Sequence, residues 1–199
     1  MLLSIDTSAG ASVAVVDAGC VLGSADETDT RSHAEAIGRL ILEALAQAGA
    51  SPAEITAVVA GMGPGPFTGL RVGIAAAYAF AAGRGIPVHP VVSHDAVAQG
   101  TTGPLLVVTD ARRREVAYST YADGERTDGP HLAHPDELAT VVAGYAGYTR
   151  VDAAQLSAAS LGLRAEQLLA RGEPTGPGQP LYLRAPDVTP SAGPKRVTG

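Results

Sequence analysis

The segment whose spacing most strongly suggests chemistry is a loop rich in glycine and proline. It comprises Gly63, Pro64, Gly65, Pro66, Phe67, Thr68 and Gly69. Glycines ahead of a helix allow backbone amides to close around an anion, and the helix dipole adds to the attraction. The loop lacks the Gly-Lys-Ser/Thr of a P-loop and the last glycine of a dinucleotide fingerprint. We therefore favour a tight strand-to-helix turn, with an anion site as the alternative.

A second polar group stands at the end of the first apolar stretch. Asp6, Thr7 and Ser8 follow that stretch directly, at a position where a carboxylate could hold a metal-bound phosphate. Such a site would favour glycines, because they let the backbone approach the phosphate closely. Thr7 and Ser8 stand there instead. We therefore favour a strand end that caps its own turn over a nucleotide contact.

Asp110 and Glu115 enclose the only dense basic run, which consists of Arg112, Arg113 and Arg114. Arginines in this density could bind a phosphate through Arg112, with Asp110 as a polar neighbour. Alternatively, they could form a solvated turn that is held by salt bridges. The second interpretation is favoured, and it also suits a contact surface for an acidic partner.

The histidines and the cysteine give weaker signals. His33 stands at the start of a predicted helix with no second histidine within a turn, so a surface position is favoured over a ligand or a base. His131 and His134 have an H-x-x-H spacing but no nearby thiolate or carboxylate to complete a metal site. Cys20 is the only cysteine, which excludes a disulfide within the chain. No metal site is predicted.

The apolar periodicity predicts an α/β fold. Ser32 and Glu35 form a capping box, which places a helix start there. Strands are expected at residues 2–6, 11–17, 20–25, 55–60, 88–92, 105–109 and 115–121, the last two as a hairpin. Helices are expected at residues 32–48, 70–82, 93–99, 135–143 and 156–170, followed by a linker at 173–180 and an extended piece at 181–184.

The predicted helix at residues 70–82 is apolar on nearly every face. A helix of this kind must be covered on nearly every face, and at this length it cannot span a membrane. It is therefore either the central helix of the fold or a helix with one side packed on another chain.

Composition limits the classes of function. The chain has 199 residues and a formal net charge of −6. It lacks the basic stripe of most nucleic-acid binders, so we do not expect strong RNA binding by the chain alone. The first residues form an apolar strand without a basic region, and no apolar run is long enough to cross a bilayer. A soluble cytoplasmic protein without membrane contact is expected.

Several segments together resemble one known family. Residues 63–73 closely resemble G-P-G-S-F-T-G-L-R-[IV]-G, the signature of the TsaB (YeaZ) family. Residues 3–8 resemble its I-D-T-S strand, residues 110–116 its D-A-R-R-x-E-V segment, and residues 180–184 its P-x-Y-L-R segment. These matches follow the family's order over nearly the whole chain. Pro66 replaces the serine of the signature, which removes a hydroxyl and a backbone donor.

The resemblance implies the actin-like, Hsp70-like ATPase (ASKHA) superfold, with two ribonuclease-H-like lobes that each combine a mixed sheet with helices. On this basis residues 1–102 form an N-terminal lobe that carries the partner-binding helices. Residues 103–185 form a smaller C-terminal lobe, and residues 186–199 form a flexible tail.

The resemblance also implies a function. TsaB proteins are non-catalytic subunits that partner TsaD and TsaE in the threonylcarbamoyl (t6A) modification of tRNA adenosine 37. The family's first two helices contact TsaD or a second copy of the chain, and the matching residues here are Ile37, Leu40, Ile41, Leu45, Leu70, Ile74 and Tyr78. Arg71 belongs to the signature. A homodimer is expected for the chain alone, tRNA contact only through the complex, and no intrinsic cofactor, although ATP or ADP could bind at the partner interface.

Two other functions stay open at this point. A small-molecule kinase or ATPase of the same superfold would use Asp6 and the glycine-rich loop around a nucleotide phosphate. A peptidase would need a nucleophile with a base or a metal cluster, and neither pattern is present. The absence of glycines after Asp6 argues against the first alternative.

Overall fold

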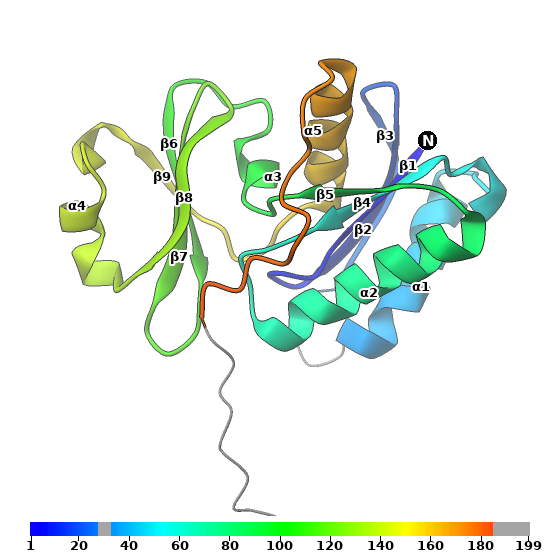
Figure 1. The fold of residues 1–199 in the computed structure, drawn as a ribbon, viewed down its shortest axis with the longest axis horizontal. Coiled ribbons are helices and arrows are strands. Elements are labelled where there is room, and N and C mark those ends of the chain that lie inside the picture. Colours follow the sequence, from blue (N-terminus) through cyan, green and yellow to red (C-terminus); the bar gives the residue numbers. More distant parts are fainter. Residues whose placement is uncertain (28–32, 185–199) are drawn as a thin grey trace, which may run out of the picture.

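Two β-sheets with helices on their faces form the protein (Figure 1). The computed structural model describes residues 1–27 and 33–184, without the side chains of residues 33–35. The predicted capping box of Ser32 and Glu35, the side chain of His33 and the predicted tail at 186–199 therefore lie outside the described residues. Of the helices in the described part, none is long and apolar enough to cross a membrane.

The first sheet has five strands in the order β3-β2-β1-β4-β5. The first three strands form an antiparallel meander, whereas β4 and β5 run parallel to β1. This mixed sheet is the ribonuclease-H-like arrangement that was predicted. Its strands are β1 (Leu2–Asp6), β2 (Ala11–Asp17), β3 (Cys20–Glu27), β4 (Ala57–Gly61) and β5 (Val88–Val91).

Helices cover both faces of this sheet, and the alternation of side chains along β1 separates two cores. Leu3 and Ile5 point into the core beneath α1 (His33–Gln47) and α2 (Phe67–Arg84). Leu2 points to the opposite face, which α5 (Ala158–Ala170) covers. Figure 1 shows α1 and α2 together on one side and α5 on the other. The predicted helix at 70–82 is confirmed as α2, which ends at a left-handed glycine, Gly85.

The second sheet repeats the pairing of the first with fewer strands, in the order β8-β7-β6-β9. Strand β6 is antiparallel to β7 and parallel to β9, just as β1 is antiparallel to β2 and parallel to β4. The predicted hairpin is confirmed as β6 and β7. The elements of this lobe are β6 (Pro104–Asp110), β7 (Val116–Ala122), β8 (Glu125–Ala133), η2 (Pro135–Glu137), α4 (Leu138–Val141), η3 (Tyr145–Gly147) and β9 (Thr149–Asp152). The first lobe adds η1 (Pro52–Glu54).

Three features of the second lobe differ from the predictions. Strands β8 and β9 were not predicted, because both are mostly exposed and lack apolar alternation. The helix predicted at 135–143 is only the short η2 and α4, since Val142 returns to an extended conformation. The range 103–185 was assigned to the second lobe, yet α5 packs on the first sheet. The second lobe is therefore an insertion between β5 and α5.

The lobes are joined by buried polar side chains around α3 (Asp95–Ala98), the short helix between the two sheets in Figure 1. His94 is fully buried; its Nδ1 lies 2.9 Å from the Ser119 Oγ and its Nε2 lies 2.8 Å from the Thr109 Oγ1. Asp95 accepts hydrogen bonds from the Tyr121 hydroxyl at 2.8 Å and from the Arg126 Nε at 3.0 Å. All of these partners belong to the second sheet, so His94 and Asp95 fix one lobe against the other.

We expect this junction to make the protein less stable in mild acid. Burial lowers the pKa of His94 to about 3, and the charge of Arg126 acts in the same direction. Below the ordinary histidine pKa of about 6.5, the unfolded chain therefore takes up a proton that the folded chain refuses. The free energy of unfolding should fall by about 1.4 kcal/mol per pH unit between those two values. Urea unfolding at about pH 7 and about pH 5 measures the effect.

The variant His94→Gln is the control, since an amide can bond to the same hydroxyls but does not titrate. Burial also lowers the pKa of His89, but His89 is present in both proteins and its contribution cancels. Equal pH dependence in the wild type and in His94→Gln would show that His94 does not hold the junction in its neutral form.

Candidate functional site at the cleft between the lobes

The glycine-rich loop connects β4 to α2 and is clamped on both sides. The Gly63 amide donates to the Ser93 Oγ at 2.9 Å, and the Ser93 amide donates to the Gly63 carbonyl at 2.8 Å. A side chain at Gly65 would meet the Ser8 Cα at 2.7 Å, so only glycine fits there. Gly63 has φ +92° and precedes a cis peptide bond to Pro64. The contacts favour the tight-turn interpretation of the loop.

Thr7 joins the end of β1 to the first turns of α2 through its hydroxyl. Thr7 Oγ1 donates to the Gly69 carbonyl at 2.7 Å and accepts from the Gly73 amide at 3.0 Å. Those two backbone groups are the pair that an ordinary i to i−4 helix bond would connect. A Cβ at Gly73 would lie 2.2 Å from this hydroxyl. Thr7 therefore has a packing role, and a small residue is required opposite it.

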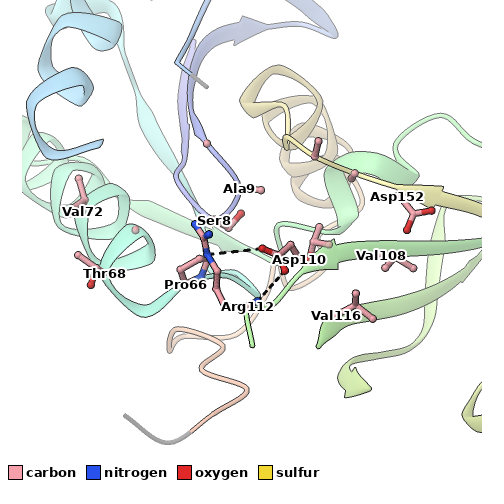
Figure 2. A pocket seen from close by; sticks show the side chains of 15 residues that line it. Ser8, Ala9, Pro66, Thr68, Val72, Val108, Asp110, Arg112, Val116 and Asp152 are labelled. Atoms are coloured by element: carbon pink, nitrogen blue, oxygen red, sulfur yellow. Dashed lines mark hydrogen bonds and ion pairs between the residues drawn. The ribbon is translucent and has the colours of Figure 1, made fainter. Parts of the chain in front are cut away.

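The start of α2 has no side-chain cap. Its N-cap residue is Pro66, which accepts nothing through its side chain and has no N–H of its own. Serine or threonine at this position would normally satisfy one of the free amides of the first turn. Pro66 and Thr68 face a cavity of about 590 Å³ between the lobes (Figure 2). The free helix end therefore opens into the cleft.

The cleft has mainly small side chains and a mixed charge. Its first-lobe wall comes from the end of β1 and the start of α2, and its second-lobe wall from the ends of β6 and β9. The residues that line it are Ser8, Ala9, Gly10, Pro66, Thr68, Gly69, Val72, Val108, Thr109, Asp110, Arg112, Val116, Asp152, Ala153 and Ala154. Two carboxylates face one guanidinium, so the cleft offers little net attraction for a polyphosphate.

Asp6 does not line this cavity. Its side chain is buried, and one carboxylate oxygen accepts hydrogen bonds from the Ser8 amide and hydroxyl. Burial raises the pKa of Asp6 above its ordinary value, although the bonds from Ser8 and Ser93 act in the opposite direction. Asp6 therefore caps the turn behind the cleft, as the favoured interpretation had it. Of the three residues after β1's apolar stretch, only Ser8 lies on the cavity wall.

The arginine run forms the turn between β6 and β7. Arg112, Arg113 and Arg114 have φ values of +65°, +55° and +64°, a left-handed backbone that costs an L-residue about 1–2 kcal/mol each. The Arg112 amide donates to the Asp110 Oδ1 at 3.0 Å, and the Arg112 Nε lies 3.9 Å from the Asp110 Oδ2 (Figure 2). Asp110 and Arg112 thus lie together on the second-lobe wall, as the sequence order suggested.

The residues predicted for a partner contact divide into two groups. Ile37, Leu40, Leu45 and Leu70 are buried inside this chain. Ile37, Leu40 and Leu45 belong to the core beneath α1 and α2, and Leu70 is fully buried as well. The expectation that these four residues lie at a partner surface is therefore corrected. Ile41 and Ile74 are half-buried, and Tyr78 is 45% exposed. Leu42, which is 68% exposed on α1, was not predicted, because the amphipathic spacing places it on the polar face.

The remaining histidines make no metal site among the described residues. His131 Nε2 lies 2.9 Å from the Asp128 Oδ1, and His134 Nδ1 lies 3.2 Å from the Arg114 carbonyl. No group of three metal-ligating side chains occurs in the described part of the chain. The buried His94 was missed by the sequence reasoning; its only signal was the polar triplet of residues 93–95 directly after a buried strand.

The chain is similar to proteins of a tRNA modification pathway. A family model described as TsaD, tRNA N6-adenosine threonylcarbamoyltransferase, matches residues 22–164. An uncharacterised protein of Mycobacterium tuberculosis is 42% identical over 96% of this chain and 95% of its own length. The tRNA threonylcarbamoyladenosine biosynthesis protein TsaB of Escherichia coli is 33% identical over 67% of this chain and 64% of its own. A solved structure of YeaZ from Pseudomonas aeruginosa has a TM-score of 0.73 at 27% identity, over 92% of this chain and 99% of that one.

Two glycines on α2 give a matched test of the Thr7 contact. Gly73→Ala should destabilise the protein by about 1–3 kcal/mol, because the new methyl group overlaps the Thr7 hydroxyl. Gly83 has open space around its Cα, so Gly83→Ala should stabilise the same helix by up to about 1 kcal/mol. Urea unfolding of both variants provides the measurement. A Gly73→Ala protein as stable as Gly83→Ala would contradict the packing role of Thr7.

Proposed function

The chain belongs to the TsaB (YeaZ) family of tRNA threonylcarbamoyladenosine biosynthesis proteins, and we propose that it is the non-catalytic dimerisation subunit of a TsaB–TsaD–TsaE complex. The expected resemblance to this family is confirmed by the sequence and structural matches. In the proposed role the chain supports a TsaD partner, which carries out threonylcarbamoyl transfer to tRNA adenosine. Contact with tRNA then occurs within the complex, in the cytoplasm.

The observation that carries this proposal is the outward face of α2. Ala75, Tyr78, Ala79 and Ala82 are exposed and recur at three- and four-residue spacing. They form a flat apolar strip with one large side chain, and Ile74 is half-buried beside it. Small residues allow the backbone of a second helix to approach closely, and a tyrosine provides an anchor of the kind that dominates interface energies.

Helix α1 supplies further exposed apolar area in the same lobe. It packs against α2, and Leu42 and Ile41 add apolar area to the same lobe. Only the start of α2 lines the cleft to the second lobe, and the end of α2 lies farther from that lobe in Figure 1. A partner that presents a similar pair of helices could therefore bury both surfaces in one four-helix contact. A second copy of this chain could do the same when TsaD is absent.

The kinase or ATPase alternative is less well supported. It needs an acidic side chain that reaches a metal-bound phosphate, and Asp6 is buried behind the cleft and bonded to Ser8. Pro66 at the start of α2 also removes the cap hydroxyl that a polar ligand site would favour. These features support a role without catalysis for this subunit. The proposal still includes ATP or ADP bound at the partner interface.

A charge on the apolar strip should abolish the complex. Tyr78→Arg places a guanidinium where a partner helix would pack, because Tyr78 projects from the centre of the strip. Co-purification with the TsaD of the same organism, followed by measurement of the complex mass, gives the readout. We expect the wild type to form a stable complex and Tyr78→Arg to weaken it by at least about a hundredfold, since a buried unpaired charge costs about 3–5 kcal/mol.

Val141→Arg is the matched control. Val141 lies on α4 of the second lobe and is 49% exposed, against 45% for Tyr78. It should leave the complex intact. A folded wild-type chain that forms no complex with TsaD, or loss of the complex in both variants, would contradict the proposed interface.

A further inference from the structure

A second cavity adjoins the cleft at the arginine turn and shares Pro66, Asp110 and Arg112 with it. Its volume is about 350 Å³, which is at the lower end of the range for small-ligand sites. The glycine-rich loop forms one wall, the turn after β6 a second, and the last described residues a third. We name it the arginine–aromatic pocket, because its lining includes Phe67, Arg112, Arg113, Tyr182 and Arg184. None of these residues belongs to the apolar strip of α2.

An aromatic pair in this pocket orients a further arginine. The Phe67 and Tyr182 rings lie 4.6 Å apart between centroids with an interplanar angle of 43°. The Arg71 Cζ stands 3.7 Å from the Phe67 centroid, and the Arg71 Nε donates to the Tyr182 hydroxyl at 3.3 Å. These contacts occupy one face of the Phe67 ring and the Nε of Arg71. The two terminal nitrogens of Arg71 have no hydrogen-bond partner among the described residues, so this pre-oriented fork is free to bind an oxyanion.

The end of the described chain holds the pocket in place. After α5 the chain passes between the lobes (orange in Figure 1), and the Leu181 amide donates to the Met62 carbonyl at 2.8 Å. Arg184 forms an ion pair with Glu115 and donates to the Arg112 carbonyl at 3.3 Å. Tyr182 is therefore fixed against both the glycine-rich loop and the arginine turn.

The charge of this region differs in sign from that of the whole chain. The protein carries a net charge of −6, yet arginines outnumber carboxylates around the pocket. Glu115 is paired with Arg184, and Asp110 lies 3.9 Å from Arg112, a side chain that is 59% exposed. The chain beyond residue 184 contains Asp187, Lys195 and Arg196, so its side chains carry a net positive charge. The ligand that fits is therefore an external anion.

We propose that the arginine–aromatic pocket, together with Arg71 beside it, contacts a single-stranded segment of RNA, with phosphates on Arg71 and Arg112 and an unpaired base on Tyr182. The aromatic rings favour RNA over an acidic peptide, because bases stack on such rings while carboxylates gain nothing from them. The proposal rests on the role in tRNA modification and deepens it. A site of this size is weak alone, in keeping with the chain's acidic balance, and it adds to the affinity of a partner complex.

The test measures binding of a fluorescein-labelled single-stranded oligoribonucleotide to the isolated full chain by anisotropy at low and moderate salt. We expect a dissociation constant on the order of 10–100 µM at low salt, which weakens as salt rises. The double variant Arg71→Gln and Arg112→Gln should weaken binding by at least about tenfold and lower the salt slope by about 1.4, since each lost phosphate contact contributes about 0.7. Tyr182→Leu should weaken binding by about five- to tenfold with the salt slope retained.

Arg84→Gln is the matched control, because Arg84 is an exposed arginine on the same helix, about 20 Å from Arg71. It should bind RNA like the wild type. If the double variant does not fold, the single variant Arg112→Glu replaces it in the test, because the Arg112 side chain is exposed. No binding by the wild type at low salt, or equal binding by wild type and pocket variants, would overturn the proposal. Tighter binding of polyglutamate than of RNA, lost in the same variants, would overturn it in favour of an acidic protein segment.

Co-purification with TsaD in parallel separates the two proposals. Pocket variants that lose RNA binding yet still form the complex support the pocket independently of the partner interface. A wild-type chain that binds RNA through the pocket but forms no complex would leave this proposal standing while the proposed partner role fails.

Discussion

The hydroxyl of Thr7 lies between the Gly69 carbonyl and the Gly73 amide of α2, two groups that would otherwise bond to each other. The geometry of the first lobe depends on that contact. It fixes the start of α2 directly against the end of β1, so Gly73 tolerates no side chain. The loop before α2 then has a single short route, between Ser8 and Ser93. The cleft, the uncapped helix end and the direction of the apolar strip all follow from the position in which α2 is held.

The junction of the lobes applies a second constraint of the same kind. His94 and Asp95 present buried polar groups to Thr109, Ser119 and Tyr121, and buried polar groups that lose their partners cost about 1–3 kcal/mol each. Arg164 on α5 reaches Glu125 on β8 as well, and hydrogen bonds from Arg164 and Arg171 lower the pKa of that carboxylate to about 2. The lobes are therefore held as one unit, which suits a subunit that supports a partner more than one that closes around a substrate.

The sequence predicted the first lobe well because its elements follow simple rules. β1 is a short, mostly apolar strand that is buried along its whole length, and α2 is an apolar helix that follows a glycine-rich turn. The exposed strand β8 has no such pattern, and only its pairing with β7 defines it. The site was harder, because burial within the chain depends on tertiary packing. Leu40 and Leu45 have the same residue type as Leu42, yet only Leu42 is exposed. The stack of Phe67 with Tyr182 joins residues more than a hundred positions apart, and no local spacing could indicate it.

The return of the chain to the first sheet after the second lobe affects how the protein is made. The face of the sheet formed by Leu2, Val16, Val59 and Val91 is covered by α5, which ends at Ala170. On a ribosome that adds about 5–20 residues per second, this apolar surface waits several seconds or more for its cover after β5 has emerged. The strand pairings of the second lobe all lie within residues 104–152, so that lobe can fold during that interval. The nascent first lobe is then a half-covered sheet, the kind of species that chaperones bind, and its completion depends on contacts between the two ends of the chain.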